Sequence, residues 1–174
     1  MEGVSFVLGF PLTTGEIMIL TQIEEYFEKQ NWQYSLQKDE TDNSYLSTSY
    51  HEIGDTIFSL FLEIYPDNQS LKLYLYAPNQ VPEDKISEVL YLLNYINSAI
   101  MGANLVVVGG DTIRQQEFLK YTGAVSEEAL NFLFFPSFAL LDEYYPYILN
   151  LLISNTTATD QIARINAVKS KRLN

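Results

Sequence analysis

A short alternating stretch, Leu71 to Tyr76, places the strongest constraint on the fold of this chain. Three leucines on one side alternate with a lysine and two tyrosines on the other: Leu71, Leu73, Leu75 and Lys72, Tyr74, Tyr76. This period predicts a β-strand with one apolar face and one amphipathic face. The residues before it, Pro66 to Gln69, favour a turn, and a second strand-like segment, Thr56 to Tyr65, ends there. Because so short a connection cannot cross over a sheet, the two strands must pair antiparallel.

Further strands are predicted on both sides of this hairpin. Alternation at Trp32 to Leu36 and the aromatic segment Tyr45 to Tyr50 each indicate a strand, separated by a polar loop. Later in the chain, Gly109-Gly110-Asp111 lies between Asn104 to Val108 and Thr112 to Lys120. Glycine readily adopts the positive φ that tight hairpins need, so these two segments are expected to pair as well.

Helices are predicted before, between and after these strands. Thr13 and Glu16 have the spacing of a capping box, which predicts a helix that ends near Gln30. Pro82 and the acidic residues after it indicate the start of a second helix, and Ser126 that of a third. Pro136 and Pro146 each remove an internal hydrogen bond from the third helix, so it is expected to be kinked or divided into segments. The predicted fold class is α+β, an antiparallel sheet of about five strands flanked by helices in the order α-β-β-β-α-β-β-α.

The charge of the chain divides it into an acidic body and a basic end. Six basic residues accompany all 22 acidic ones in residues 1 to 160, a net charge of −16, and the last fourteen residues carry +4. An acidic body repels phosphate backbones, so we expect no binding to nucleic acid. We expect three parts: an N-terminal segment (1–12), one α+β domain (13–154) and a basic C-terminal tail (155–174) that includes a short helix.

The sequence lacks the residues that several kinds of catalytic and metal-binding site require. Cysteine is absent, which excludes disulfides, thiolate nucleophiles and cysteine zinc sites. The single histidine, His51, has Ser47, Ser49 and Glu52 nearby, but residues of one strand do not converge as a catalytic triad does, so we interpret His51 as a surface residue. No apolar run approaches the roughly 18 residues of a membrane-spanning helix. We therefore expect a cytoplasmic protein with no cofactor, no metal and no membrane span.

Acidic clusters and a glycine pair are two further patterns found in binding sites. Acidic clusters at Asp39, Glu40 and Asp42 and at Asp142 and Glu143 lack the spacing of a calcium loop and are typical of solvated surfaces. A pair of carboxylates that meets only in three dimensions stays open as an enzyme alternative. Gly109 and Gly110 lack the lysine of a phosphate-binding loop, which favours the hairpin interpretation.

The order of elements, together with two local motifs, resembles the YbjN domain family of bacterial proteins. The motifs are the second helix end, Leu92 to Asn97, followed by a hairpin, and Glu127 to Leu130 leading into Asp142 to Pro146. The resemblance implies a fold similar to that of type III secretion chaperones, which are small, acidic and often dimeric. Members of the family are mostly of unknown function and are described as regulators of sensory transduction or as chaperone-like. The resemblance implies no catalytic residues.

Tyrosine is the positive signal for function, with 13 in the chain. Tyrosine is enriched at protein interfaces because it combines a rigid apolar ring with a polar tip. We expect a non-enzymatic, chaperone-like or regulatory domain that binds a protein partner and forms a homodimer. The predicted contact residues lie on strands and on the second helix: Tyr65, Tyr74, Tyr76, Tyr91 and Tyr95. Docking of the basic tail, Arg164 to Arg172, on an anionic surface is a further alternative.

Overall fold

A computed structural model describes residues 13–39 and 44–172 of the chain. The N-terminal segment 1–12, and Glu40 and Asp42 of the first acidic cluster, lie outside the described residues. The described helices are α1 (Thr14–Lys29), α2 (Ile86–Ala99), α3 (Glu127–Ile153) and α4 (Ala158–Arg172), with a 3-10 turn η1 (Glu83–Lys85) before α2. The strands are β1 (Ser35–Asp39), β2 (Ser44–Ile53), β3 (Thr56–Tyr65), β4 (Ser70–Gln80), β5 (Leu105–Val108) and β6 (Thr112–Lys120).

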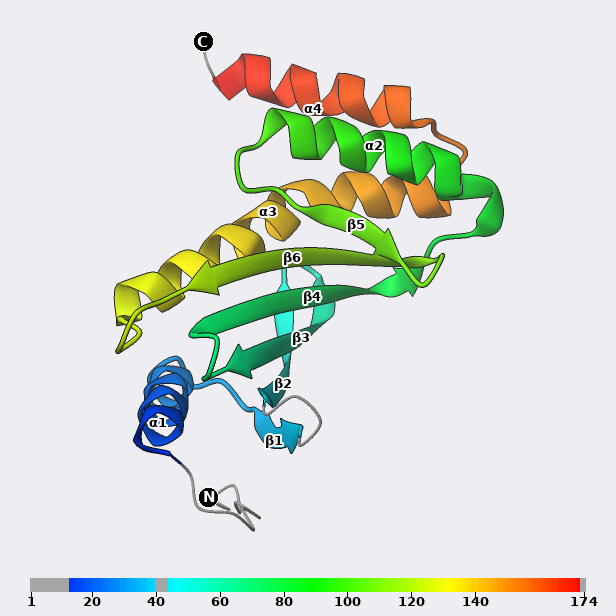
Figure 1. The fold of residues 1–174 in the computed structure, drawn as a ribbon. Coiled ribbons are helices and arrows are strands. Elements are labelled where there is room, and N and C mark those ends of the chain that lie inside the picture. The colour runs from blue at the N-terminus through cyan, green and yellow to red at the C-terminus, as the bar shows by residue number, and fades with distance from the viewer. Residues whose placement is uncertain (1–12, 40–43, 173–174) are drawn as a thin grey trace.

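The strands form one antiparallel sheet in the order β1-β2-β3-β4-β6-β5 (Figure 1). The predicted α+β class is therefore confirmed, with one correction. Four strands, not three, precede α2, which makes six in the described residues. The first strand also begins later than predicted, at Ser35, because the Trp32 N–H donates to the Phe27 carbonyl at the end of α1 and is not available for pairing in the sheet.

Local signals account for most of the element boundaries. The Thr13 side chain accepts from the Glu16 N–H, and the Glu16 carboxylate accepts from the Thr13 N–H at 2.7 Å, so the predicted capping box is present. Ser126 caps α3 as predicted, by accepting from the Ala129 N–H. In the β5–β6 hairpin, Gly109 and Gly110 have φ values of 62° and 96°, which residues with a Cβ rarely adopt.

The third helix is continuous across both of its prolines. It spans Glu127–Ile153 with Pro136 and Pro146 inside, and its two halves run in different directions in Figure 1. A change of direction at a proline relieves the clash of the ring with the preceding turn. The chain therefore uses one bent helix here, the kinked form of the prediction.

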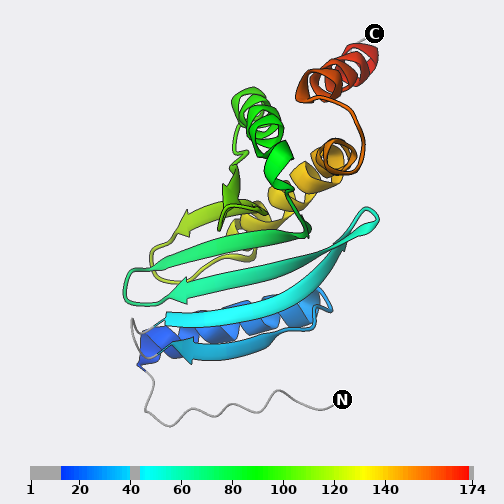
Figure 2. The same cartoon turned by 90° about the vertical axis from the view of Figure 1, so that its right-hand side faces the viewer.

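One face of the sheet forms the core with α1 and α3. Phe58, Leu60 and Leu62 of β3 and the leucines of β4 are completely buried on this face. Each such side chain contributes roughly 1.5–3 kcal/mol by leaving water. Figure 2 shows α1 near the β1 end of the sheet, while α2, α4 and the end of α3 gather near the β5 end.

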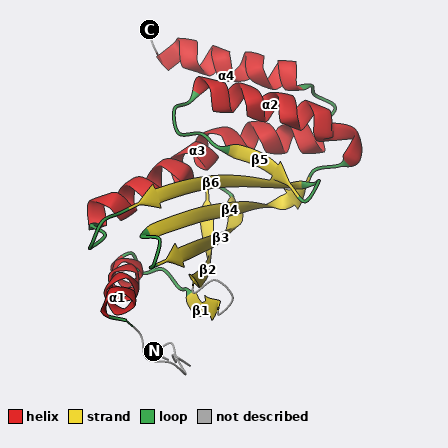
Figure 3. Ribbon diagram, viewed as in Figure 1, coloured by secondary structure: helices red, strands yellow, loops and turns green. Residues whose placement is uncertain are grey.

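The C-terminal residues form a helix that packs on this second helical group (Figure 3). Thr157 and Asp160 make a capping interaction, in which the Thr157 hydroxyl accepts from the Asp160 N–H. Ala158, Gln161 and Ile165 are buried, and the Ala158 N–H donates to Glu88 of α2 at 2.6 Å. Within the described residues, no helix has both the length and the apolar character needed to cross a membrane.

Candidate functional site

The second face of the sheet carries polar and aromatic side chains, and no described helix lies over it (Figures 1 and 2). We call this surface the open face. Its central members come from β2, β3, β4 and β6: Leu46, Phe61, Glu63, Tyr65, Lys72, Tyr74, Tyr76, Arg114, Gln116 and Phe118. Strand register brings them together, because Phe61 lies opposite Tyr74, and Tyr76 lies opposite Arg114. Side chains at such paired positions touch across the strands.

A charged network holds one side of this face. The Glu63 carboxylate accepts hydrogen bonds from the hydroxyls of Tyr65, at 2.8 Å, and Tyr74, at 3.3 Å. Lys72 lies 3.6 Å from the same carboxylate and 4.5 Å from the centre of the Tyr65 ring. Burial, followed by the negative charge of Glu63, raises the pKa of the Tyr74 hydroxyl. These contacts favour the neutral form of the Tyr74 hydroxyl and restrain its ring on both sides.

Arg114 holds the other side of the face. Its guanidinium lies 4.6 Å from the centre of the Tyr74 ring and donates to the Tyr76 hydroxyl at 3.1 Å and to Gln116 at 2.6 Å. Phe61 meets Tyr76 edge-on, with ring centres 5.3 Å apart. Because these rings are already fixed, a partner that packs against them loses little side-chain entropy in ordering them.

Two shallow hollows flank Tyr74. One, of about 270 Å³, is lined by Leu46, Phe61, Glu63, Tyr74 and Tyr76. The other, of about 240 Å³, is lined by Lys72, Tyr74, Asn104, Gln116, Glu117 and Phe118. Each is large enough for one side chain and too open to enclose a small substrate. The open face can therefore accept the side chains of an extended or helical segment laid across it.

The structure brings together three of the five predicted tyrosines. Tyr65, Tyr74 and Tyr76 share the open face, whereas Tyr91 and Tyr95 lie on α2. Tyr91 is exposed, and the Tyr95 hydroxyl donates to Asn166 of α4 at 2.6 Å. The prediction missed Phe61 and Arg114. The turn at Pro66 to Gln69 could have identified Phe61, since it sets the β3–β4 register that places this residue opposite Tyr74.

His51 is half-buried, and not the fully exposed surface residue that the sequence indicated. Its ring packs edge-on against Trp32 at 4.4 Å and is stacked on Phe138 at 5.2 Å. Burial lowers the pKa of His51 to about 4, so the ring is neutral at pH 7. Its contact with Ser49 measures 2.9 Å, but that serine is buried and a base of such low pKa is weak, which argues against nucleophilic catalysis.

The other predicted acidic cluster lies on α3. Glu143 pairs with Arg172 of α4 at 2.8 Å, and Asp142 lies beside Gly54. Across residues 13–39 and 44–172, no group of three or more histidine, aspartate and glutamate side chains is arranged to hold a metal ion.

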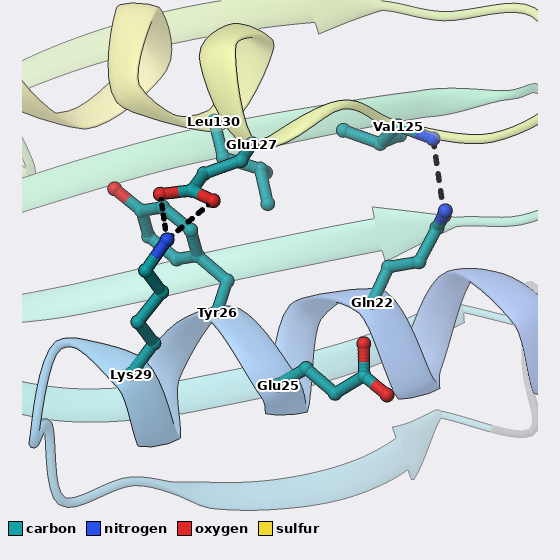
Figure 4. A pocket seen from close by; sticks show the side chains of 7 residues that line it. All are labelled: Gln22, Glu25, Tyr26, Lys29, Val125, Glu127 and Leu130. Carbon is teal, nitrogen blue, oxygen red and sulfur yellow. Dashed lines mark hydrogen bonds and ion pairs between the residues drawn. The ribbon is translucent and has the colours of Figure 1, made fainter.

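A polar pocket between α1 and the start of α3 is a structural junction (Figure 4). Lys29 lies 2.6 Å from one oxygen of Glu127, and Gln22 accepts from the Val125 N–H at 3.0 Å. These groups satisfy one another across the two elements. We therefore assign the pocket to the packing of α1 and not to a ligand.

No protein-family model and no curated protein matches the sequence. A solved structure that does match is the crystal structure of YbjN from E. coli, described as a candidate transcription regulator, with a TM-score of 0.50 and 11% sequence identity. The match covers 74% of this chain and 93% of that protein. At this identity the likeness shows a shared fold. The resemblance inferred from the sequence is thus confirmed at the level of the fold.

Proposed function

We propose that this chain is a non-enzymatic binding domain that recognises a segment of another protein on the open face. The observation that carries the proposal is the cluster of pre-positioned aromatic rings, Phe61, Tyr74 and Tyr76, on a sheet face that no described helix covers. Aromatic side chains that are held rigidly at a surface provide contact area at a low entropic cost, as in known interface hot spots.

The charge of the open face supports the same function. Lys72 and Arg114 lie on this face, and they are two of only six basic residues in the first 160. Together with Glu63 they make the face close to neutral in an otherwise strongly acidic body. An acidic protein partner therefore meets less repulsion here than elsewhere on the body.

The biological role that fits best is regulatory or chaperone-like. The fold is shared with YbjN, which is described as a candidate transcription regulator. In this proposal the domain acts through protein contact, in the cytoplasm, as a homodimer. Light scattering coupled to size-exclusion chromatography tests the dimer, because a solution mass near 19.9 kDa would identify a monomer.

The alternatives have less support from the geometry. A docking arm needs free cations, but Arg172 pairs with Glu143, and Lys169 lies 5.6 Å from the centre of the Tyr144 ring. An enzyme needs converging acids in an enclosed pocket, whereas the hollows of the open face are shallow and neither is lined by more than one acidic residue.

The experiment replaces Tyr74 and Tyr76 together with serine and measures the capture of partner proteins from the native cell. We expect capture of the specific partner to weaken by at least about tenfold, since interface hot spots contribute about 1.4 kcal/mol or more. Tyr91→Ser is the matched control, because Tyr91 is also exposed but lies on α2. Unchanged capture by the folded double variant would reject the open face as the binding surface.

A further inference from the structure

A separate apolar pocket lies on the opposite side of β6 from the open face. It has a volume of about 390 Å³, and three elements line it: Ile100, Met101, Gly102 and Ala103 after α2, Glu117, Phe118 and Leu119 of β6, and Phe132, Leu133, Pro136 and Leu140 of α3. Glu117 and Leu119 point to this side because they lie opposite Leu73 and Leu71, which are buried in the core.

The shortness of β5 explains why this space exists. β5 pairs with β6 only from Val108↔Thr112 to Leu105↔Gln115. Beyond that point, at Glu117 to Leu119, β4 is the only described strand beside β6. The strand that would continue the sheet is replaced by a loop, which leaves a recess between β6 and α3. Met101 and Phe132 are strongly exposed at its rim.

One charged group stands in this apolar recess. Glu117 is the only lining residue with an ionisable side chain, and its Oε1 accepts from Gln115 Nε2 at 3.0 Å. Glu117 is half-buried, and this burial raises the pKa of its carboxyl by disfavouring the ionised form. None of the ion pairs among the described residues includes Glu117. A carboxylate in apolar surroundings is costly unless a cation compensates it.

We propose that this pocket binds a small apolar amine, with the ammonium group at Glu117 and the hydrocarbon body among Leu119, Leu133 and Leu140. The charge of the ligand follows from the single carboxylate and from the net charge of −12, which attracts cations. Its size follows from the pocket volume, which falls within the range of small-ligand sites. The site lies on the other side of β6 and shares only Glu117 and Phe118 of that strand with the hollows of the open face, so either proposal can fail without the other.

The test uses three probes of one shape. 4-Phenylbutylamine carries the expected charge, 4-phenylbutan-1-ol is neutral, and 5-phenylpentanoate is anionic. In NMR titrations of the full chain, we expect the amine to shift the amides of Glu117, Phe118 and Leu133 saturably. The alcohol is expected to bind about tenfold more weakly, because it loses the charge-assisted hydrogen bond, and the pentanoate more weakly still.

Two variants make the result decisive. Glu117→Gln keeps the shape of the side chain and should reduce amine binding to the level of the alcohol. Ala103→Phe fills the pocket from the loop and should abolish binding of both probes. Equal binding of amine and alcohol to the unmodified protein, an unchanged preference in the Glu117→Gln variant, or shifts that map outside the pocket would each overturn the proposal. The acetylated and amidated peptide Leu-Lys-Leu serves as a further probe. If it binds tenfold more tightly than 4-phenylbutylamine, the proposal is overturned, since the occupant would then be a protein side chain.

Discussion

The packing of His51 predicts that acid destabilises this protein through one neutral histidine. Burial against Trp32 and Phe138 lowers the pKa of His51 to about 4 in the folded chain, from an ordinary value of 6.5. The unfolded chain therefore binds a proton between pH 6.5 and pH 4 that the folded chain does not. The resulting contribution to stability is fully present above pH 6.5 and is lost as the pH falls toward 4.

The size of this effect follows from the difference between the two pKa values. If the whole pKa difference acts on stability, the free energy of unfolding falls by about 2.5 kcal/mol between pH 7 and pH 4.5, because each pKa unit is equivalent to about 1.4 kcal/mol. Because the ring is only partly shielded from water, we expect the measured loss to lie between about 1 and 2.5 kcal/mol. A loss of this size is a large fraction of the stability of a typical domain.

The assay compares the unmodified protein with His51→Gln by urea unfolding at both pH values. Gln does not titrate, so the difference between the two free energies of unfolding isolates the histidine. Glu16, Glu24 and Glu117 have shifted pKa values too, but they titrate in both proteins and cancel in the difference. A difference that stays constant within about 0.5 kcal/mol would refute the assignment of His51 to a half-buried, neutral state.

The remaining predictions concern the fold. Thr13→Ala removes the hydroxyl that accepts from the Glu16 N–H. It should lower the free energy of unfolding by about 1 kcal/mol in urea titrations. An unchanged value would show that the cap is not formed in solution. Leu73→Ala removes a completely buried side chain of β4 and should lower the free energy of unfolding by about 2–5 kcal/mol in the same assay. Lys72→Ala on the open face should lower it by less than about 1 kcal/mol. Equal decreases would contradict the assignment of the two faces. Gly110→Val forces a β-branched residue to a φ of 96° and should lower the melting temperature, while Thr112→Val in the adjoining strand should leave it nearly unchanged.

Local chemistry determines the parts of the fold that the sequence predicts. The capping box at Thr13, the alternating leucines of β4 and the glycine hairpin each depend on residues within a few positions of one another. The same is true of the antiparallel β3–β4 pair, whose short turn leaves no other arrangement. Together these signals are sufficient for the α+β class and for three residues of the candidate site.

Contacts between distant segments determine the parts that could not be predicted. His51 is half-buried because Trp32 and Phe138 pack against its ring, and no local pattern indicates either contact. The Tyr95 hydroxyl donates to Asn166 because α4 packs on α2, and the polar composition of the tail does not indicate this packing. Arg114 joins the site only through the β4–β6 pairing, which the intervening helix α2 conceals in the sequence.

Site-specific photo-crosslinking in the native cell tests the central claim most directly. Replacing Tyr76 with a photoreactive phenylalanine analogue places the probe on the open face, and the same replacement at Tyr91 places it on α2. We predict that the probe at position 76 forms a covalent adduct with a discrete partner protein, and that the probe at position 91 does not. Adducts at position 91 alone, or the absence of any adduct at position 76, would contradict the open face as the binding surface.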